Sequence, residues 1–305
     1  MTTSADCSSL NFLDCSRFLC NYRGVAEGNE EIGRTVDVGG VATNYHDLGT
    51  GSPVLLVHGS GPGVSAWANW RTVLPRLAER HRVVAPDVLG FGYTQRPPDV
   101  AYGPDVWLDH LLGFLDAIDL PKVSVVGNSF GGALALRLAA KAPDRVDRLV
   151  LMGSVGVPFD LTPGLEAVWG FEPSFDAMRD LMGIFTYDRA AVSDDLARLR
   201  LDAATRPGVH EAYSRMFPAP RQDGVDAMAL DDGVIAALPH ETLIVHGRDD
   251  RVIPLATSLR LLELVDRSQL HVFARCGHWV QIEHGARFAA LVEGFLAEGS
   301  GAAAR

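Results

Sequence analysis

The segment 127–131, with the sequence GNSFG, constrains the fold of this 305-residue chain more than any other. Apolar residues at 123–126 precede it, and small and apolar residues at 132–136 follow it. This order predicts a strand, a sharp turn and a helix, because small residues beside Ser129 let the backbone reverse within a few positions. Such a turn points the serine hydroxyl out of the sheet, toward the N-terminus of the next helix. Since backbone N–H groups and the helix dipole favour negative charge there, Ser129 is a candidate nucleophile.

Short apolar runs and amphipathic stretches alternate along most of the chain. The first two predicted strands, 35–38 and 41–47, form a hairpin around Gly39-Gly40. Further strands are predicted at 54–57, 82–85, 123–126, 146–152, 242–245 and 269–273. Helices are predicted at 66–80 (perturbed by Pro75), 105–118, 130–141, 255–265 and 285–296. Alternation of this kind specifies an α/β fold with a mostly parallel sheet covered by helices on both faces.

The alternation stops between residues 155 and 238 and then resumes. This stretch shows no good strand pattern, and helices are predicted at 174–185, 193–204 and 209–217. A helical insertion between two halves of one sheet is expected to be a lid that covers and shapes the pocket. The predicted organisation is an N-terminal, flexible extension (1–31), a core in two pieces (32–154 and 239–298) and the helical lid (155–238).

Composition narrows the class of function. The net charge of −11 argues against nucleic-acid binding, which relies on a basic surface. It also means that a local arginine must hold any anionic substrate. Since no apolar run approaches the ~20 residues of a membrane span and no signal peptide is apparent, we expect a cytoplasmic protein with no membrane partner. The four cysteines (Cys7, Cys15, Cys20 and Cys276) are expected to be free thiols, because their spacing does not suit zinc.

A serine nucleophile needs a base, and the base needs a carboxylate. His278 follows the last predicted strand, which is the position expected for the base. Asp249 and Asp250 both follow the strand 242–245. We choose Asp250, because neighbouring side chains on an extended turn point apart and only one of the two can face His278. The chain order Ser129, Asp250, His278 is that of the α/β-hydrolase fold.

The site also needs donors for a developing oxyanion, each typically worth ~3 kcal/mol. One predicted donor is the N–H of Phe130, directly after the nucleophile. The second is the N–H of Ser60, in the glycine-rich loop 58–63 that follows the strand 54–57. Gly59 and Gly61 would let the backbone approach a substrate closely. The loop lacks the lysine of a phosphate-binding loop, so it is not read as one.

Four motifs together resemble the meta-cleavage product hydrolases, which cleave carbon–carbon bonds in aromatic degradation. They are HGSGPG at 58–63, WANW at 67–70, GNSFGG at 127–132 and CGHW at 276–279. The likeness runs from about residue 32 to residue 296. The lid segments 164–170 and 216–222 look most like the 2-hydroxymuconate-semialdehyde hydrolase type.

The resemblance implies a small anionic substrate, a 2-hydroxy-6-oxo-dienoate. In this family its C1 carboxylate and C2 oxygen are held by three residues, which by position in the motifs are Arg200, Asn128 and Trp279. Arginine suits the task because its planar fork matches a carboxylate. Arg198 competes with Arg200 for this role, and Asn69 and the Ser60 hydroxyl are further candidates for polar contacts.

The implied reaction converts 2-hydroxymuconate semialdehyde to 2-hydroxypenta-2,4-dienoate and formate, by ketonisation and then acyl transfer to Ser129. It needs no metal or organic cofactor, and the family implies a homodimer or larger homo-oligomer. The C6 group (formyl, methyl or larger) stays open, and Val252, Phe217 and Trp169 are expected near it. The alternatives are a carboxylesterase or perhydrolase, which needs the triad but not Arg200, and a non-catalytic binding protein, which needs no activated nucleophile.

Overall fold

The computed structural model describes residues 29–298, and residues 31–298 belong to one compact unit. The expected extension, 1–31, lies almost wholly outside the described residues, and so do three of the four cysteines (Cys7, Cys15 and Cys20). The fourth, Cys276, is a buried free thiol.

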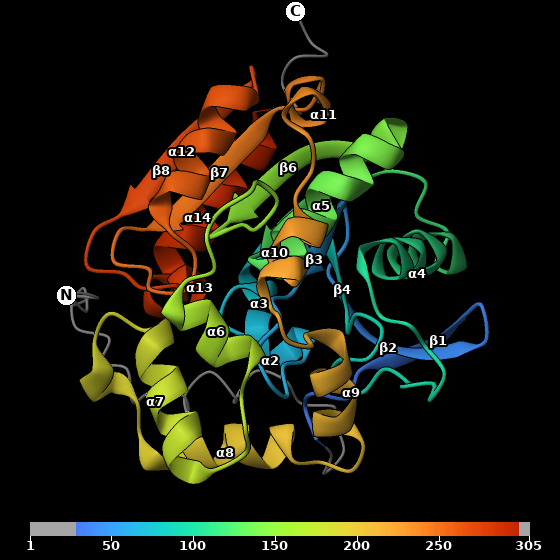
Figure 1. Cartoon of the computed structure of the whole chain (residues 1–305). Helices are drawn as coiled ribbons and strands as arrows, with labels where there is room; N and C mark the ends of the chain where they lie inside the picture. Colours follow the sequence, from blue (N-terminus) through green and yellow to red (C-terminus); the bar gives the residue numbers. More distant parts are fainter. Residues whose placement is uncertain (1–28, 299–305) are drawn as a thin grey trace, which may run out of the picture. The chain divides into compact units, whose positions relative to one another are not determined.

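An eight-stranded sheet runs through the compact unit (Figure 1). Its strands are β1 (Arg34–Val38), β2 (Val41–Leu48), β3 (Ser52–Val57), β4 (His81–Pro86), β5 (Val123–Asn128), β6 (Val146–Met152), β7 (Thr242–Gly247) and β8 (Ser268–Phe273). Their order across the sheet is β1-β2-β4-β3-β5-β6-β7-β8. Only β2 runs antiparallel to its neighbours. The predicted mostly parallel sheet is therefore confirmed.

The predicted hairpin joins β1 and β2. Gly39 and Gly40 form its two-residue loop, with φ angles of +59° and +88°. Two positive φ angles in succession give the turn whose twist matches that of the flanking strands, and glycine adopts them without a steric penalty.

Helices cover both faces of the sheet. One face carries α2 (Ala66–Trp70), α3 (Leu74–Leu77) and α14 (Gly285–Ala297), and the other carries α4 (Pro104–Ala117), α5 (Phe130–Lys141) and α12 (Leu255–Leu264). Successive residues of β3 point to opposite faces: Leu55 and Val57 pack with α4 and α5, whereas Val54 and Leu56 pack with α2 and α3. Because both faces are covered, residues 54–57 of this strand are all apolar and buried.

The predicted helix 66–80 is two short helices, α2 and α3, and Arg80 is not helical. Pro75 lies in the first turn of α3. It has no N–H to donate and its ring would clash with the carbonyl of Arg71, so a helix that starts at α2 cannot continue through it. The break places Arg71 at the C-cap of α2.

Between β6 and β7 the chain is helical, and residues 153–241 contain no strand. The helices are α6 (Pro163–Trp169), α7 (Phe175–Phe185), α8 (Asp194–Ala204), α9 (Val209–Met216), α10 (Gln222–Met228) and α11 (Asp232–Ala236), with a 3₁₀ turn at Arg189–Ala191. Figure 1 shows α6 to α9 gathered at one end of the sheet. The helices α7, α8 and α9 match the prediction. The sequence analysis missed α6, α10, α11 and the short α13 (Val280–Glu283), although Thr162 before Pro163 is a helix-start signal.

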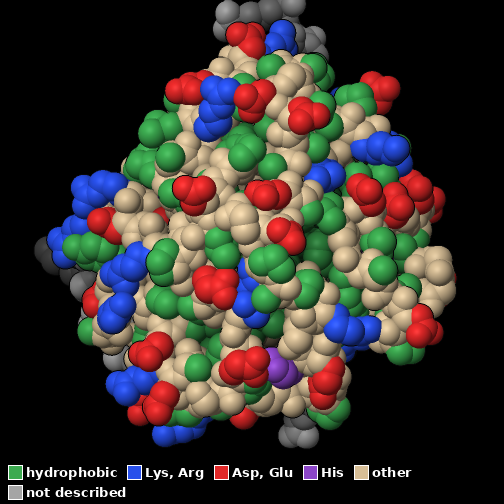
Figure 2. All heavy atoms as spheres, viewed as in Figure 1, with side chains coloured by type: hydrophobic (Ala, Val, Ile, Leu, Met, Phe, Trp, Pro, Cys, Tyr) green, Lys and Arg blue, Asp and Glu red, His purple; other side chains and the backbone are tan. Residues whose placement is uncertain are grey.

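The surface carries both signs of charge. Figure 2 shows acidic and basic side chains interspersed over the face in view, with apolar groups between them. Among the described residues, no helix is long and apolar enough to cross a membrane.

Candidate active site

Ser129 occupies a sharp turn between β5 and α5. Its φ angle is +55°, a region that non-glycine residues rarely adopt. The turn is held because the Ser129 N–H donates to the Met152 carbonyl at 2.8 Å. The backbone is so close around it that a Cβ at Gly131 would lie 2.3 Å from the Val57 carbonyl oxygen, and one at Gly127 would lie 2.4 Å from the Gly131 oxygen. The glycines of the motif are therefore required by space.

His278 and Asp250 form a buried pair. The His278 Nδ1 atom lies 2.7 Å from Asp250 Oδ2, and Asp250 Oδ1 accepts from the N–H groups of Val252 and Ile253 at 2.7 and 3.0 Å. Burial alone would raise the pKa of Asp250. The charge and hydrogen bond of His278, together with His246 and the Ile253 N–H, outweigh it, so the pKa of Asp250 lies below its ordinary value. The carboxylate is thus ionised at neutral pH and fixes the proton on Nδ1 of His278.

The side chain of Asp249 does not face His278. Its side chain is 30% exposed and lies 3.5 Å from the Arg248 guanidinium, while its N–H donates to the Cys276 carbonyl. Of the two acids weighed from the sequence, the one beside His278 is Asp250.

The end of α7 is bound to the segment that carries His278. The Phe185 carbonyl accepts from the His278 N–H at 2.7 Å, and the Phe185 ring stacks on Trp279 with centroids 4.6 Å apart. The lid therefore contributes directly to the position of the histidine, a contact between residues about 90 positions apart that no sequence pattern indicates.

Two further residues, also missed from the sequence, restrict the histidine. Gly153 directly follows β6 with a φ angle of +50°, and a Cβ there would lie 3.2 Å from His278 Nδ1 and 3.3 Å from Asp250 Oδ2. The Glu283 carboxylate accepts the N–H of Gly277 at 2.6 Å. The absence of a side chain at Gly153 leaves room for the His278–Asp250 pair. The contact with Glu283 fixes the backbone at Gly277, directly before His278.

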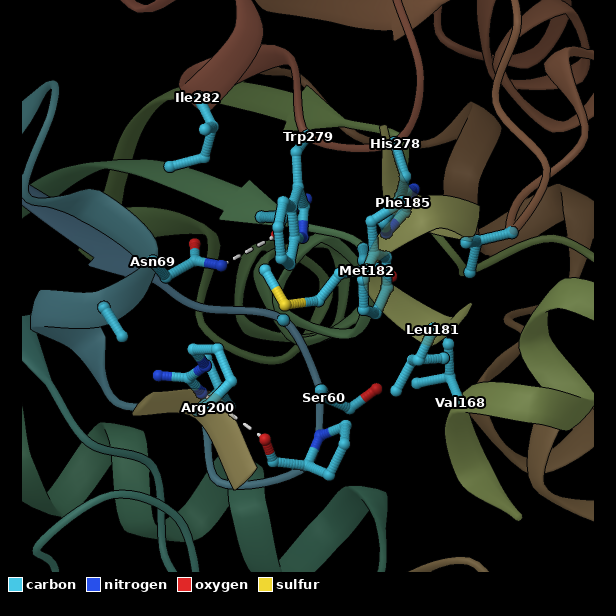
Figure 3. A pocket seen from close by; sticks show the side chains of 18 of the residues that line it. Ser60, Asn69, Val168, Leu181, Met182, Phe185, Arg200, His278, Trp279 and Ile282 are labelled. Carbon is cyan, nitrogen blue, oxygen red and sulfur yellow. Dashed lines mark hydrogen bonds between the residues drawn. The ribbon is translucent and has the colours of Figure 1, made fainter. Parts of the chain in front are cut away.

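A single cavity collects the predicted site residues under the lid (Figure 3). Those that line it are Gly59, Ser60, Gly61, Asn69, Asn128, Ser129, Arg200, His278 and Trp279. Asp250 does not line it and lies behind the His278 ring. Within residues 29–298 the Ser129 hydroxyl makes no hydrogen bond to this ring, although both border the cavity. Contacts of this kind often close only when the reactant is bound.

The two predicted oxyanion donors belong to the start of α5 and to the loop that follows β3. Phe130 is the first residue of α5, so its N–H has no partner inside the helix. Its side chain is buried in the core. Ser60 is held by the lid, because its hydroxyl accepts from Trp169 Nε1 at 2.9 Å and its carbonyl accepts from the Tyr213 hydroxyl at 2.8 Å.

Two of the three residues expected near the C6 group do not line the cavity. Val252 lines it, but Trp169 and Phe217 do not. Their rings stack on each other with centroids 4.6 Å apart, and Phe217 also packs against Phe130. The lid helices turn these aromatic faces into the core. The apolar lid residues that do line the cavity are Leu165, Val168, Met178, Leu181, Met182, Phe185 and Leu196.

Amide groups form one polar wall. Asn128 is buried, its Oδ1 accepts from Asn69 Nδ2 at 3.2 Å, and its Nδ2 donates to the Met152 carbonyl at 3.4 Å. A Cβ at Gly59 would lie 2.9 Å from Asn128 Oδ1, so only glycine leaves this amide in place. The Oδ1 atom of Asn69 is buried without a partner among the described residues, which leaves an acceptor for a ligand hydroxyl.

Arg200 brings a cation into the cavity. Its side chain is 11% exposed, Nη2 donates to the Pro62 carbonyl at 3.4 Å, and the Glu31 carboxylate lies 3.9 Å from Nη1. Burial lowers the pKa of Arg200; Glu31 raises it again only in part. Arg198 is 60% exposed and does not line the cavity. Figure 3 shows Arg200 across the cavity from His278.

Two neutral histidines support the loops beside the cavity. His58 Nδ1 contacts the Gly59 carbonyl at 2.7 Å and its Nε2 accepts the Val88 N–H at 3.0 Å. His110 Nε2 contacts the Thr43 hydroxyl at 2.9 Å. Burial lowers the pKa of each ring to about 4. Protonation would destroy the acceptor on His58.

Lowering the pH from 7 to 5 is expected to reduce the free energy of unfolding by roughly 2 kcal/mol. The unfolded chain protonates both His58 and His110 as the pH falls through about 6.5, whereas the folded protein does so only near 4. Asp87 opposes them, because burial raises its pKa to about 6 and the folded protein takes up that proton first. The stability lost through the two imidazoles is larger than the stability gained through the one carboxyl group, so the net effect is a loss.

Denaturant titrations at both pH values would measure this loss. The variant His110→Asn should show a much smaller pH dependence than the unmodified chain. Equal or greater stability at pH 5 would contradict the assignment of neutral buried imidazoles.

A serine on a strand–turn–helix elbow, with a histidine and an aspartate at the ends of later strands of this sheet, defines the α/β-hydrolase class. A family model described as alpha/beta hydrolase fold matches residues 52–200. The 2-hydroxy-6-oxo-2,4-heptadienoate hydrolase of Pseudomonas putida F1 is 63% identical over 88% of this chain and 98% of its own. The 2-hydroxymuconate semialdehyde hydrolase of Pseudomonas sp. CF600 is 58% identical over 91% and 98%.

A solved structure of the same kind of enzyme is also similar to this chain. The meta-cleavage product hydrolase CumD from Pseudomonas fluorescens IP01 superposes with a TM-score of 0.88, at 56% identity over 89% of this chain and all of that one. The chain belongs to the meta-cleavage product hydrolases, serine hydrolases of the α/β-hydrolase fold. The fold class and the family predicted from the sequence are both confirmed.

Proposed function

We propose that this chain hydrolyses the C5–C6 bond of 2-hydroxy-6-oxo-dienoates, with Ser129 as nucleophile, His278 as base and Asp250 as the supporting acid. One observation carries the proposal: the same cavity is bordered by Ser129, by His278 and by the buried guanidinium of Arg200. A plain esterase has no need of a buried cation there. Membership in a family whose relatives are named for such dienoates supports the same substrate class.

Arg200 binds the C1 carboxylate. A buried guanidinium forms strong, often bidentate hydrogen bonds to a carboxylate, and the long contact to Glu31 leaves this one only weakly paired within the cavity. Asn128, Asn69 and Trp279 lie around the C2 oxygen. The substrate thus extends from Arg200 toward Ser129, with its C6 carbonyl at the nucleophile, and this anchoring supplies the orientation that acyl transfer needs.

The reaction begins when the dienol loses its C2 hydroxyl proton and gains a proton at C5, which converts it to the C2 ketone with a C3=C4 double bond. His278 then accepts the proton of Ser129 while the serine oxygen adds to C6. The N–H groups of Phe130 and Ser60 stabilise the oxyanion that forms at C6.

Cleavage follows from the electron demand of the ketone. When the C6 oxyanion collapses, the C5–C6 bonding pair forms the C4=C5 double bond, the C3=C4 pair moves to C2=C3, and the C2 carbonyl becomes an enolate. His278 returns its proton to this leaving group, giving 2-hydroxypenta-2,4-dienoate. Water, activated by His278, then hydrolyses the acyl-Ser129 ester and releases the acid. Every step uses side chains and backbone of this chain, and no cofactor is part of the proposal.

We propose a formyl group at C6, so that the substrate is 2-hydroxymuconate semialdehyde and the acid is formate. Two relatives, 58% and 53% identical, are named for that substrate. The relative named for the heptadienoate makes a C6 methyl group the competing choice. A single methylene in an apolar pocket changes selectivity by ~10-fold or somewhat more, so the apolar lid residues decide between them.

A spectrophotometric comparison tests the proposal. The coloured ring-fission products with hydrogen, methyl or phenyl at C6 should all bleach with the enzyme, the formyl compound with the highest kcat/KM. A nitrophenyl ester, which lacks the C1 carboxylate, should react at least ~100-fold less efficiently, because it cannot use the binding energy of Arg200. If the ester is the better substrate, the carboxylesterase alternative is correct.

We also propose a homodimer or larger homo-oligomer. The β8 edge of the sheet supports it, because Val272 on β8 and Leu259 and Leu262 on the neighbouring α12 are exposed apolar residues. Light scattering in solution tests this, and a monomer mass at micromolar concentration would refute it.

A further inference from the structure

A second guanidinium borders the cavity. Arg71 is the C-cap residue of α2, and it lines the same cavity as Arg200. Its Nη1 donates to the Ala68 carbonyl at 2.9 Å, which holds the side chain against its own helix. Ala68 and Asn69 line the cavity too, so one side of this end of α2 borders the ligand space.

The charge of Arg71 is not neutralised by a neighbour. Within residues 29–298, no carboxylate lies within 4 Å of its guanidinium. The charge of Arg71 is felt at Arg200, whose pKa is lowered by burial first, raised by Glu31, and lowered further by Arg71 and Arg206. Two like charges that line one cavity favour a ligand with more negative charge than Glu31 provides.

The position of Glu31 limits its role as a counter-charge. Its carboxylate accepts from the Ser65 hydroxyl at 2.9 Å, whereas its contact with Arg200 is 3.9 Å long. The ion pair is therefore at the outer limit of such contacts. In a chain whose net charge is −11, this end of the cavity carries an excess of positive charge.

We propose that Arg71 is a second substrate-binding residue, which together with Arg200 holds the doubly charged C1–C2 end of the reacting dienoate. The inference rests on the proposed function. When the C5–C6 bond breaks, the electron pair reaches the C2 oxygen, so the leaving group carries one negative charge on the C1 carboxylate and a second on the C2 enolate. One guanidinium balances the single negative charge of the ketone form, whereas two guanidinium groups balance the two negative charges of the dienolate.

The second cation therefore acts mainly on the cleavage step. Because the C2 charge develops only as the bond breaks, Arg71 stabilises the transition state more than the bound ketone, and its loss should appear in kcat more than in KM. The released product carries a single charge, on its carboxylate, because its C2 oxygen is protonated, so the loss of Arg71 should change product binding little.

The test compares Arg71→Met, which keeps the apolar stem and removes the charge, with Arg71→Lys, which keeps the charge. We expect Arg71→Met to lower kcat on the ring-fission product by about 10-fold and Arg71→Lys to recover most of it. Hydrolysis of a nitrophenyl ester, which uses the same serine but carries no C1–C2 charge, should stay within about twofold. The control Arg198→Met removes an exposed arginine from α8 and should behave as the unmodified enzyme.

A binding measurement keeps the outcome separate from the proposed function. 2-Hydroxypenta-2,4-dienoate is added as an inhibitor of ester hydrolysis, and its inhibition constant should change by less than about threefold in Arg71→Met, because its C2 oxygen is uncharged. Unchanged kcat in Arg71→Met would overturn the role of Arg71, and so would an equal loss of ester hydrolysis, which indicates a structural defect. If the unmodified enzyme neither cleaves the dienoate nor is inhibited by the product, the proposed function itself has failed.

Discussion

Replacing Ser129 by alanine is expected to reduce kcat for the ring-fission product by about 10⁴-fold or more, with the dissociation constant of the substrate changed by less than about threefold. Only the hydroxyl group is lost, and in the proposed mechanism its oxygen forms the covalent bond to C6. Arg200, Asn128 and the rest of the cavity wall stay in place. Stopped-flow absorbance would follow turnover and binding in the same experiment, because the substrate is coloured.

The matched control is Ser124→Ala. Ser124 is buried in β5, the strand that leads to the elbow, but it does not line the cavity. Its kcat should stay within about twofold of the unmodified enzyme. Turnover by Ser129→Ala at a comparable rate would show that water, not the serine, attacks C6.

The change Asp250→Asn is expected to lower kcat by about 10³- to 10⁴-fold while the protein stays folded. Asparagine keeps the Oδ1 atom that accepts from Val252 and Ile253, so the local turn is preserved. Its amide places a donor where the carboxylate accepted from His278 Nδ1 at 2.7 Å. The imidazole would then present an N–H, in place of a lone pair, toward Ser129. Steady-state kinetics with a melting curve would separate the two effects.

Asp249→Asn is the control for that change. Asp249 is adjacent in sequence, carries the same charge and lies on the other side of the turn near Arg248, so its kcat should be nearly unchanged. A larger loss in Asp249→Asn than in Asp250→Asn would reverse the assignment made from both the sequence and the geometry.

The core of the fold could be predicted because burial on two faces leaves a plain signal. Residues 54–57 of β3 and 149–152 of β6 are all apolar and buried, and α5 and β6 have the predicted bounds, residues 130–141 and 146–152. The short helices of the lid were harder to predict, because a helix of seven residues such as α6 completes only two turns and shows little periodicity. Pro75 was expected to perturb the helix 66–80, but the division of that helix into α2 and α3 was not predicted.

The site likewise has one part that the sequence predicts and another that it does not. Ser129, Asp250 and His278 follow strands of a parallel sheet, whose carboxyl ends meet at one edge, so their chain order predicts their meeting. Contacts made by the lid carry no such signal. Phe185 reaches the histidine because of how α7 packs, and the inward turn of Trp169 depends on the rotation of α6 about its axis. A hydrophobic pattern indicates that a helix has an apolar face, but not which aromatic residue borders the cavity.

The most direct measurement of the central proposal is product analysis after turnover of 2-hydroxymuconate semialdehyde in ¹⁸O-labelled water. Cleavage through an acyl-Ser129 intermediate predicts equal amounts of 2-hydroxypenta-2,4-dienoate and formate, with one labelled oxygen in the formate and none in the dienoate. Consumption of substrate without these two fragments, or no consumption by a protein that hydrolyses simple esters well, would contradict it.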